Sequence, residues 1–136
     1  MEVPAIELRD LTIPAKEEAS TSIRERVIRG RMIQLKRLAG EKRITCNARL
    51  TSRLIRKHCA LDAASLDVLN QAMSNLSLSA RAYDRILKVA RTIADLAGAS
   101  RIQADHVAEA VRYRTLDRIF GKYGAALEKS LPLETR

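Results

Sequence analysis

Arg81 and Arg85 lie one helical turn apart at the start of the most regular apolar pattern in this 136-residue chain. Ser79 is placed to cap the helix that the pattern predicts, since its side-chain oxygen can accept a hydrogen bond from a backbone N–H of the first turn. Arg81 then falls in that first turn, where the helix dipole disfavours cations and attracts anions. The residues alone favour a solvated surface charge. A bound phosphate is the alternative, because a guanidinium can contact two phosphate oxygens without losing its proton.

The helix that positions these arginines is predicted from apolar side chains at the spacing of an amphipathic helix. They are Ala80, Tyr83, Ile86, Leu87, Ala90, Ile93, Ala94 and Ala97. Gly98 ends the pattern, as glycine does after many helices. The opposite face is charged, and on it Asp84 with Lys88 and Arg91 with Asp95 stand at the i, i+4 spacing of ion pairs. The two arginines at the start of the helix have no acidic residue at that spacing.

A second set of candidate residues is basic and lies between residues 24 and 58. This segment holds twelve basic and two acidic side chains, whereas residues 1–23 hold two and five, and residues 59–136 hold eleven and nine. It therefore accounts for the net charge of +9 and can attract a phosphate backbone of any base sequence. The candidates for contact with nucleic acid or a neighbouring subunit are Arg24, Arg29, Arg31, Lys36, Arg37, Arg53, Arg56 and Lys57. A solvated helix face is an equally simple explanation.

The first of these basic residues belong to a predicted helix at residues 22–38. Ser22 and Glu25 form a capping box at its start, and Gly40 ends it. Its apolar side is expected to consist of Ile23, Val27, Met32 and Leu35. So much charge surrounds this side that the helix is predicted to be an exposed connector.

Three further helices are expected to complete the core around the central one. A short helix at residues 52–59 follows a turn at Asn47, Asp62 caps a helix that runs to about residue 75, and the last core helix starts at residue 104 or 105. The side chains expected to point inward are Leu54, Ile55, Leu66, Leu69, Met73, Leu76, Val107, Ala108, Val111 and Tyr113.

Composition favours an all-α fold. Aromatic residues make up only 3% of the chain although 46% is hydrophobic, so the core must be built from Leu, Ile, Val and Ala. These side chains suit helix-on-helix packing, and alternating runs of β-branched residues are nearly missing. The length is that of one domain with a modest core.

No motif in the chain supports catalysis by these residues alone. The phosphate-binding pattern G-x-x-x-x-G-K-[ST] and a hydrophobic run ending in paired acids are both missing, so the chain cannot hydrolyse ATP by itself. His58 and His106 are interpreted as structural, and no metal site is predicted. Cys46 and Cys59 are expected to be reduced thiols in a cytoplasmic protein, and no segment is apolar enough to cross a membrane.

Three stretches give the chain a specific resemblance to a known family. They are CNARL at residues 46–50, LSARAYDRILKVARTIADLAG at 78–98 and IQADHVAEAVRYRTLDR at 102–118. Together they resemble the C-terminal part of the magnesium-chelatase-like competence proteins, the ComM or YifB family, which are AAA+ ATPases. The resemblance is weaker over the first 45 residues and absent from the last 18. Ser77 departs from the pattern, which has glycine there.

The resemblance implies a fold and a domain organisation. The fold is a small helical bundle of the AAA+ lid type, with an N-terminal linker and a frayed C-terminal tail. Residues 1–21 are the linker from an absent nucleotide-binding domain and residues 119–136 are the tail. Residues 22–118 form the lid, divided into the basic connector helix at 22–38 and the core at 46–118. The sequence then begins inside a longer protein, and a natural start with a flexible N-terminus is the alternative.

The resemblance also implies a function. Arg81 matches the sensor 2 arginine, which reaches the γ-phosphate of the nucleotide, and Arg85 either assists it or pairs with an acid at an interface. ATP and Mg²⁺ are then cofactors of the intact protein, with none bound to this fragment. The intact protein is expected to be a DNA motor that promotes branch migration during uptake of transforming DNA. Its partners are the nucleotide-binding domain, neighbouring subunits of a homo-oligomeric ring and DNA.

The residues leave a second function open. A free-standing basic helical module that binds nucleic acid through residues 24–57, without any ATPase activity, fits the same charge distribution. A protein-binding adaptor would need a large exposed apolar patch, which the sequence does not indicate.

Overall fold

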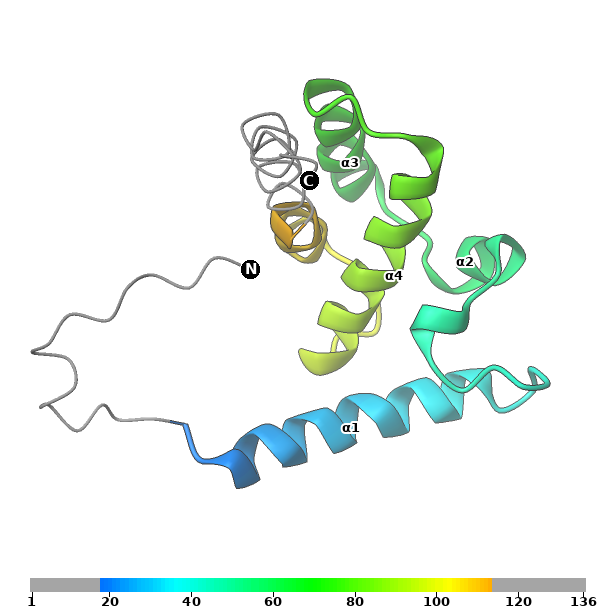
Figure 1. The fold of residues 1–136 in the computed structure, drawn as a ribbon, viewed down its shortest axis with the longest axis vertical. Helices are drawn as coiled ribbons and strands as arrows, with labels where there is room; N and C mark the ends of the chain where they lie inside the picture. The colour runs from blue at the N-terminus through cyan, green and yellow to red at the C-terminus, as the bar shows by residue number, and fades with distance from the viewer. Residues whose placement is uncertain (1–17, 114–136) are drawn as a thin grey trace, which may run out of the picture.

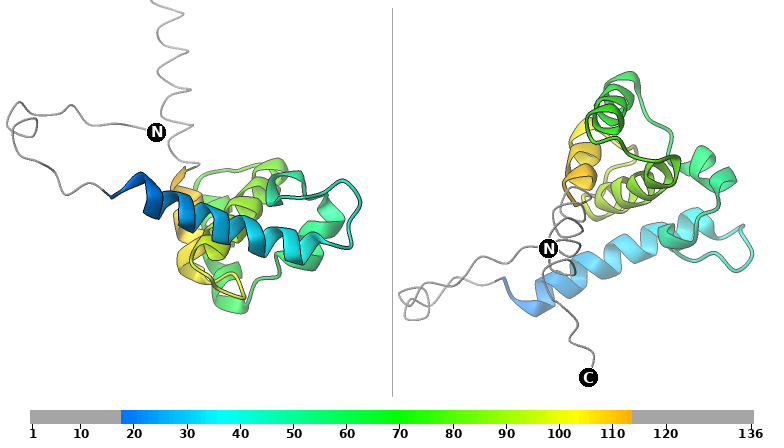
Figure 2. Two further views of the ribbon diagram at one scale, coloured as in Figure 1. Left: turned by 90° about the horizontal axis from the view of Figure 1, so that it is seen from below. Right: turned by 45° about the horizontal axis from the view of Figure 1, so that its top comes forward.

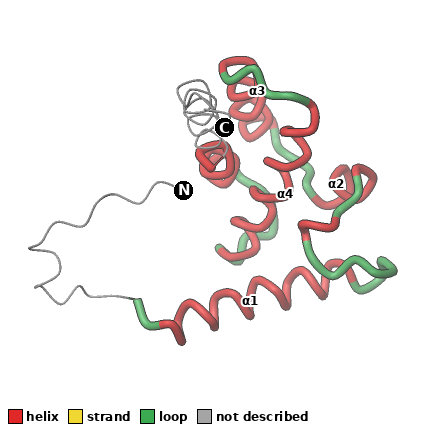
Figure 3. Tube along the Cα trace, viewed as in Figure 1, coloured by secondary structure: helices red, strands yellow, loops and turns green. Residues whose placement is uncertain are grey.

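A computed structural model of the chain describes residues 18–113. Within them the predicted all-α fold is confirmed, and no strand occurs between residues 18 and 113 (Figure 1; Figure 3). The helices are α1 (Ser20–Leu38), the 3₁₀ helix η2 (Asn47–Arg49), α2 (Ser52–His58), α3 (Ala63–Asn75) and α4 (Ala80–Leu96). Residues 104–113 form a further helical segment. The predicted tail, and nearly all of the predicted linker, lie outside the described residues.

The amphipathic helix α4 lies at the centre of the fold. α1 crosses the C-terminal end of α4, and α2, α3 and the 104–113 segment lie around the remainder (Figure 1; Figure 2). The N-terminal end of α4 therefore points away from α1. The core is formed by the buried side chains of Leu50, Leu54, Ile55, Leu69, Ile86, Leu87, Ala90, Ala94, Ile102 and Val107. Each large aliphatic side chain buried here stabilises the fold by about 1.5–3 kcal/mol.

The predicted helix caps are confirmed at three positions. The Asp62 carboxylate accepts a hydrogen bond from the Ser65 amide at 2.8 Å, and Ser79 Oγ accepts one from the Ala82 amide at 3.4 Å. Gly98 follows the end of α4 with a φ of +71°, a left-handed conformation that glycine adopts without strain.

Ser77 takes the same left-handed conformation after α3, with a φ of +46°. Its amide donates to the Ser74 carbonyl at 3.2 Å, and the Leu78 amide donates to the Met73 carbonyl at 3.0 Å. These two bonds satisfy carbonyls at the end of α3 in the arrangement of a Schellman motif. The positive φ explains why the resemblance leads us to expect a glycine at this position.

Two predictions about α1 are wrong. The helix begins at Ser20 after Ala19, without a side-chain cap, so the capping box of Ser22 and Glu25 does not form. Ile23, Val27, Met32 and Leu35 are exposed, between 41% and 61% of their full surface. The buried positions are Gly30, Gln34 and Leu38, four residues apart, because this face of α1 meets α4. A Cβ atom added to Gly30 would lie 3.0 Å from Leu96 Cδ2, which shows how closely the two helices approach.

The charged face of α4 also differs from its prediction. Arg91 and Asp95 do pair, but both are buried and not on a solvent-exposed face. Asp84 accepts a hydrogen bond from Ser52 Oγ, and Lys88 donates one to the Ala48 carbonyl, each at 3.1 Å, so these two residues bind other elements and not each other. Packing against α1 and η2 has widened the buried face of α4 beyond its apolar stripe.

Two side chains predicted to point inward are instead exposed. Leu66 on α3 has 40% of its surface accessible, and Tyr113 at the end of the described residues has 53%. The remaining inward-pointing side chains are buried or half-buried.

Candidate functional site

The N-terminal end of α4 presents two arginines to solvent. Arg81 is the second residue of the helix and Arg85 lies one turn further on; both are exposed, and neither forms a hydrogen bond or ion pair with another residue between 18 and 113. No acidic residue lies in the first turn of α4 to balance the positive end of the helix dipole. This end of the helix is therefore open to an anion.

A cavity of about 480 Å³ lies beside the first turns of α4, between that helix and α2 and α3. Tyr83, Asp84 and Leu87 line it from α4, Arg56 from α2 and Leu66 from α3. Neither Arg81 nor Arg85 is among its lining residues. The exposure of Leu66 is explained by its place at this opening.

Four of the basic candidates lie on the exposed surface of α1. Arg24, Arg31 and Lys36 form no hydrogen bond or ion pair within the described part of the chain, and Arg29 lies 3.9 Å from Glu25 across one helical turn. An exposed pair at that distance contributes little to stability, so Arg29 also remains available to a partner.

Two of the three basic candidates on α2 share one carboxylate. Glu41 pairs with Arg53 at 3.0 Å and with Lys57 at 3.2 Å, and the hydrogen bond from Lys57 is the largest of the causes that lower the pKa of Glu41. Both cations stay more than half exposed. Arg56 is exposed and lines the cavity beside α4. The cationic surface of α2 is thus partly neutralised.

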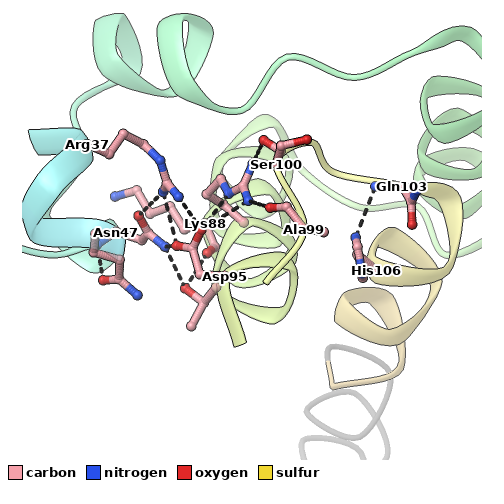
Figure 4. A network of polar contacts seen from close by, with 11 residues as sticks. Arg37, Asn47, Lys88, Asp95, Ala99, Ser100, Gln103 and His106 are labelled. Carbon is pink, nitrogen blue, oxygen red and sulfur yellow. Dashed lines mark hydrogen bonds and ion pairs between the residues drawn. The ribbon is translucent and has the colours of Figure 1, made fainter. Parts of the chain in front are cut away.

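Arg37 is the basic candidate whose charge is largely buried within the fold. Its side chain is only 18% exposed, and its guanidinium forms a two-point contact with the carboxylate of Asp95 on α4, with Nη1 at 3.0 Å from Oδ2 (Figure 4). The same nitrogen donates to Asn47 Oδ1 at 3.3 Å. We therefore assign Arg37 a structural role in place of contact with DNA or a subunit.

Asp95 is the centre of a buried polar network that sequence patterns missed. Besides Arg37, its carboxylate accepts hydrogen bonds from Asn47 Nδ2 at 2.8 Å and Arg91 Nε at 3.1 Å (Figure 4). Arg91 also donates to the carbonyls of Ala99 and Ser100, at 2.7 and 3.1 Å. Burial lowers the pKa of Arg91, and the charge of Asp95 opposes that shift. One carboxylate thus pairs with two guanidinium groups, so the network keeps one excess positive charge, and backbone carbonyls accept the remaining hydrogen bonds of Arg91.

The sequence contains one signal for this network. Gly30, Gln34 and Leu38 lie at the four-residue spacing of one helix face, but a face defined by apolar residues alone does not include a glutamine. In the structure Gln34 is buried and its Oε1 accepts a hydrogen bond from the Asn47 amide at 3.1 Å. The turn predicted at Asn47 exists as η2, and its asparagine holds α1 and α4 together.

The histidines and cysteines take up ordinary structural positions. His106 is buried and its Nδ1 accepts a hydrogen bond from the Gln103 amide at 3.1 Å, whereas His58 ends α2 half-buried. Desolvation is the main cause that lowers the pKa of His58. Cys46 and Cys59 are unpaired, and burial raises the pKa of the Cys59 thiol to about 11, which makes it a poor nucleophile.

The part of the chain between residues 18 and 113 holds neither a candidate metal site nor a candidate membrane span. No cluster of three or more potential metal-binding His, Cys, Asp or Glu side chains occurs in that range. Nor does any helix there have the length and apolar character needed to cross a bilayer.

Comparison with known proteins identifies the family of this chain. Residues 17–114 match the family described as "Magnesium chelatase, subunit ChlI C-terminal". The chain is 45% identical to the competence protein ComM of Haemophilus influenzae over 105 residues, which are 77% of this chain and 20% of that protein. It is 42% and 40% identical to the uncharacterized YifB proteins of Salmonella typhimurium and Escherichia coli, covering 77% and 75% of this chain.

The chain spans about a fifth of the length of these relatives, so the comparison concerns one region of a larger protein. Within that region the family match includes α1 to α4 and all of the described residues. The protein therefore belongs to the family of the magnesium chelatase subunit ChlI C-terminal region, with ComM and YifB proteins among its relatives.

Proposed function

We propose that this chain is the lid of a magnesium-chelatase-like AAA+ ATPase of the ComM type, and that Arg81 is its nucleotide-sensing arginine. One observation carries the proposal. Arg81 lies in the first turn of α4, exposed, and forms no hydrogen bond or ion pair within residues 18–113. Elsewhere on α4, Arg91 is fully engaged by the fold. Arg81 is thus free to contact a ligand, and it lies at a helix end that favours a phosphate.

The chemistry of phosphoryl transfer suits such an arginine. Negative charge spreads over the equatorial oxygens of the transferred phosphoryl group, and fixed cations stabilise it there. ATP and Mg²⁺ would be held by the nucleotide-binding domain, because this chain has no phosphate-binding loop. Arg81 would supply positive charge from the lid, and Arg85, exposed one turn further on, would assist it or pair with an acid of a neighbouring subunit.

A subunit contact is supported by the outward face of α1. Ile28, Met32 and Leu35 are exposed at helical spacing on this face, and basic residues flank them on both sides. Apolar side chains at i, i+4 and i+7 are the anchors by which helices enter apolar grooves. We assign this surface to contact with the nucleotide-binding domain or with the neighbouring subunit of a ring. Work on DNA, in branch migration, would then belong to the intact motor.

The substitution Arg81→Ala in the longer protein tests the proposal. ATP turnover is expected to fall by about 10²-fold, since fixed charges at the transferred phosphoryl group are worth that much or more, while nucleotide affinity and thermal stability change little. Arg101→Ala is the matched control. Arg101 is exposed and follows the opposite end of α4, about 25 Å along the helix axis.

Equal turnover in the Arg81 variant, the Arg101 control and the parent protein would remove Arg81 as a sensor. The wider assignment has its own test in the gene. The reading frame upstream of codon 1 is expected to encode G-x-x-x-x-G-K-[ST] and an acidic strand. A stop codon just upstream would contradict a motor that contains this chain.

A second candidate function is direct binding of nucleic acid. It is favoured by the exposed cations of α1, of which Arg24, Arg31 and Lys36 have no partner among the described residues. The two functions differ in one requirement. Nucleic-acid binding demands that the chain itself has affinity for DNA, whereas a lid needs none.

A further inference from the structure

We propose that Arg37 is a positioning residue that joins the connector helix α1 to the sensor helix α4, so that the two move as one body. The joint between the two helices is argued from the geometry of the Asp95 network. Its effect on ATP turnover rests on the proposed function of Arg81. Arg37 and Asp95 lie 58 positions apart in the chain, yet the guanidinium of one and the carboxylate of the other meet at two points.

Arg37 is the only member of the network's charged trio that comes from α1. Arg91 and Asp95 both belong to α4, one turn apart, and Asp95 has a completely buried side chain. Figure 4 shows Arg37 reaching from the end of α1 to the side of α4, with Asn47 beside it. The geometry makes Arg37 the direct ion pair between two elements that are otherwise joined by apolar and small side chains and, through Asn47, by neutral hydrogen bonds.

Two fixed points separated along α1 are enough to hold an orientation. Gly30 forms one, where the backbone of α1 comes within contact distance of Leu96. Arg37 forms the other, two turns later on α1, against Asp95, which directly precedes Leu96 on α4. The buried side chains of Gln34 and Leu38 pack on the same face of α1, and the ion pair at Arg37 adds a charged, directional contact that resists a pivot of α1 across α4.

The arrangement links the connector to the phosphate sensor. α1 is the first helix of the described residues and crosses the C-terminal end of α4, whereas Arg81 stands at the N-terminal end (Figure 1). A rigid α4 transmits any rotation of α1 to Arg81. Displacements of about 1 Å at a reacting group change rates by about 10²-fold, so small rotations suffice.

Arg37→Met tests the joint without removing the fold. Methionine keeps much of the apolar length of the side chain, and Asp95 stays paired with Arg91 and Asn47, so no buried charge is left alone. Hydrogen exchange of the 136-residue chain is expected to speed up at least tenfold for amides of residues 30–38 and to stay unchanged in α3 and α4. Arg37→Lys, which retains the charge, is expected to restore part of the protection.

Arg53→Met is the matched control, because Arg53 pairs with Glu41 at an exposed site. Its exchange pattern is expected to equal that of the parent chain. Unchanged protection of α1 in Arg37→Met would overturn the inference. Uniform acceleration in every helix would overturn it too, because it would show general stabilisation and not a joint between two helices.

The consequence for turnover is tested in the longer protein. Arg37→Met is expected to lower kcat about tenfold with little change in the KM for ATP, and the double variant with Arg81→Ala is expected to be no slower than Arg81→Ala alone. If Arg81→Ala has no effect, the sensor proposal fails while the exchange experiment still decides the joint. If Arg81→Ala slows turnover but the two effects multiply, the sensor stands and positioning by Arg37 fails.

Discussion

At the scale of single residues, the fold requires unusual backbone or burial at only a few positions. Ser77 and Gly98 end α3 and α4 in the same left-handed conformation, although only one of them is glycine. Arg91 and Asp95 are buried with complementary hydrogen bonds, so they cost the fold little as a pair and much if one is removed. Arg81 differs from all of these because no described contact fixes it.

Ser77→Gly is expected to raise the free energy of unfolding by about 0.5–1 kcal/mol. A side chain at a φ of +46° is strained, and glycine relieves this strain by more than it adds to the entropy of the unfolded chain. Urea denaturation of the parent and variant chains measures the difference. Gly98→Ala is expected to lower stability by about 1 kcal/mol, because alanine is strained at the φ of +71°. A Cβ there meets no atom within 4 Å, so no steric clash adds to this strain.

Gly40→Ala provides the control. Gly40 is not among the residues with positive φ, and a Cβ added to it meets nothing within 4 Å. Its substitution is expected to leave stability unchanged or to raise it slightly. A loss of stability in Ser77→Gly equal to that in Gly98→Ala would contradict the left-handed conformation at Ser77.

At the scale of elements, α1 has two faces with different uses. The inner face, with Gly30, Gln34 and Leu38, is narrow and partly polar, and it packs on α4. The outer face carries Ile28, Met32 and Leu35 exposed to solvent between basic residues. A helix that leaves its larger apolar side chains exposed among residues 18–113 offers a surface for a further contact.

Leu38→Ala and Met32→Ala test this orientation. Leu38 is 2% exposed, so its truncation is expected to cost about 2–5 kcal/mol of unfolding free energy. Met32 is 61% exposed, and its truncation is expected to change stability by less than about 0.5 kcal/mol. Chemical denaturation of both variants gives the comparison. Similar losses in the two would show that both faces of α1 are covered.

At the scale of the whole molecule, the excess positive charge is concentrated in one part of the chain. The basic excess lies in residues 24–58, on α1, η2 and α2 and the turns between them, whereas residues 59–136 are close to neutral. Glu41 and Asp95 neutralise part of it within the fold, through Arg53, Lys57 and Arg37. The cations that remain on α1 decide between the two proposed functions.

The second candidate function requires that the 136-residue chain binds DNA with an affinity that depends strongly on salt. Fluorescence anisotropy with a labelled 20-base-pair duplex, between about 50 and 200 mM salt, measures it. If α1 contacts the backbone, replacing Arg24, Arg31 and Lys36 together by glutamine is expected to reduce the slope of log affinity against log salt by about 2.7.

Replacing Arg81, Arg85 and Arg101 together by glutamine is the control, since these residues are also exposed but lie outside α1. An equal loss in both triple variants would indicate attraction by net charge and not by α1. No measurable binding by the parent chain would remove the second function and leave the lid proposal intact.

The sequence by itself determined the helices, most of their ends and the family. Helix α4, its cap at Ser79 and its end at Gly98 follow from the spacing of apolar residues and from the chemistry of one or two neighbours, which are local properties. The tertiary structure alone decided which face of α1 is buried and that Arg37 pairs with Asp95 inside the fold. These depend on how α1 crosses α4, a contact between residues 58 positions apart, and no periodicity along the chain records that crossing. At Gly30 the approach of Leu96 leaves no room for a larger side chain, whereas Gln34 and Arg37 are held by polar partners on η2 and α4 that lie far away in the sequence.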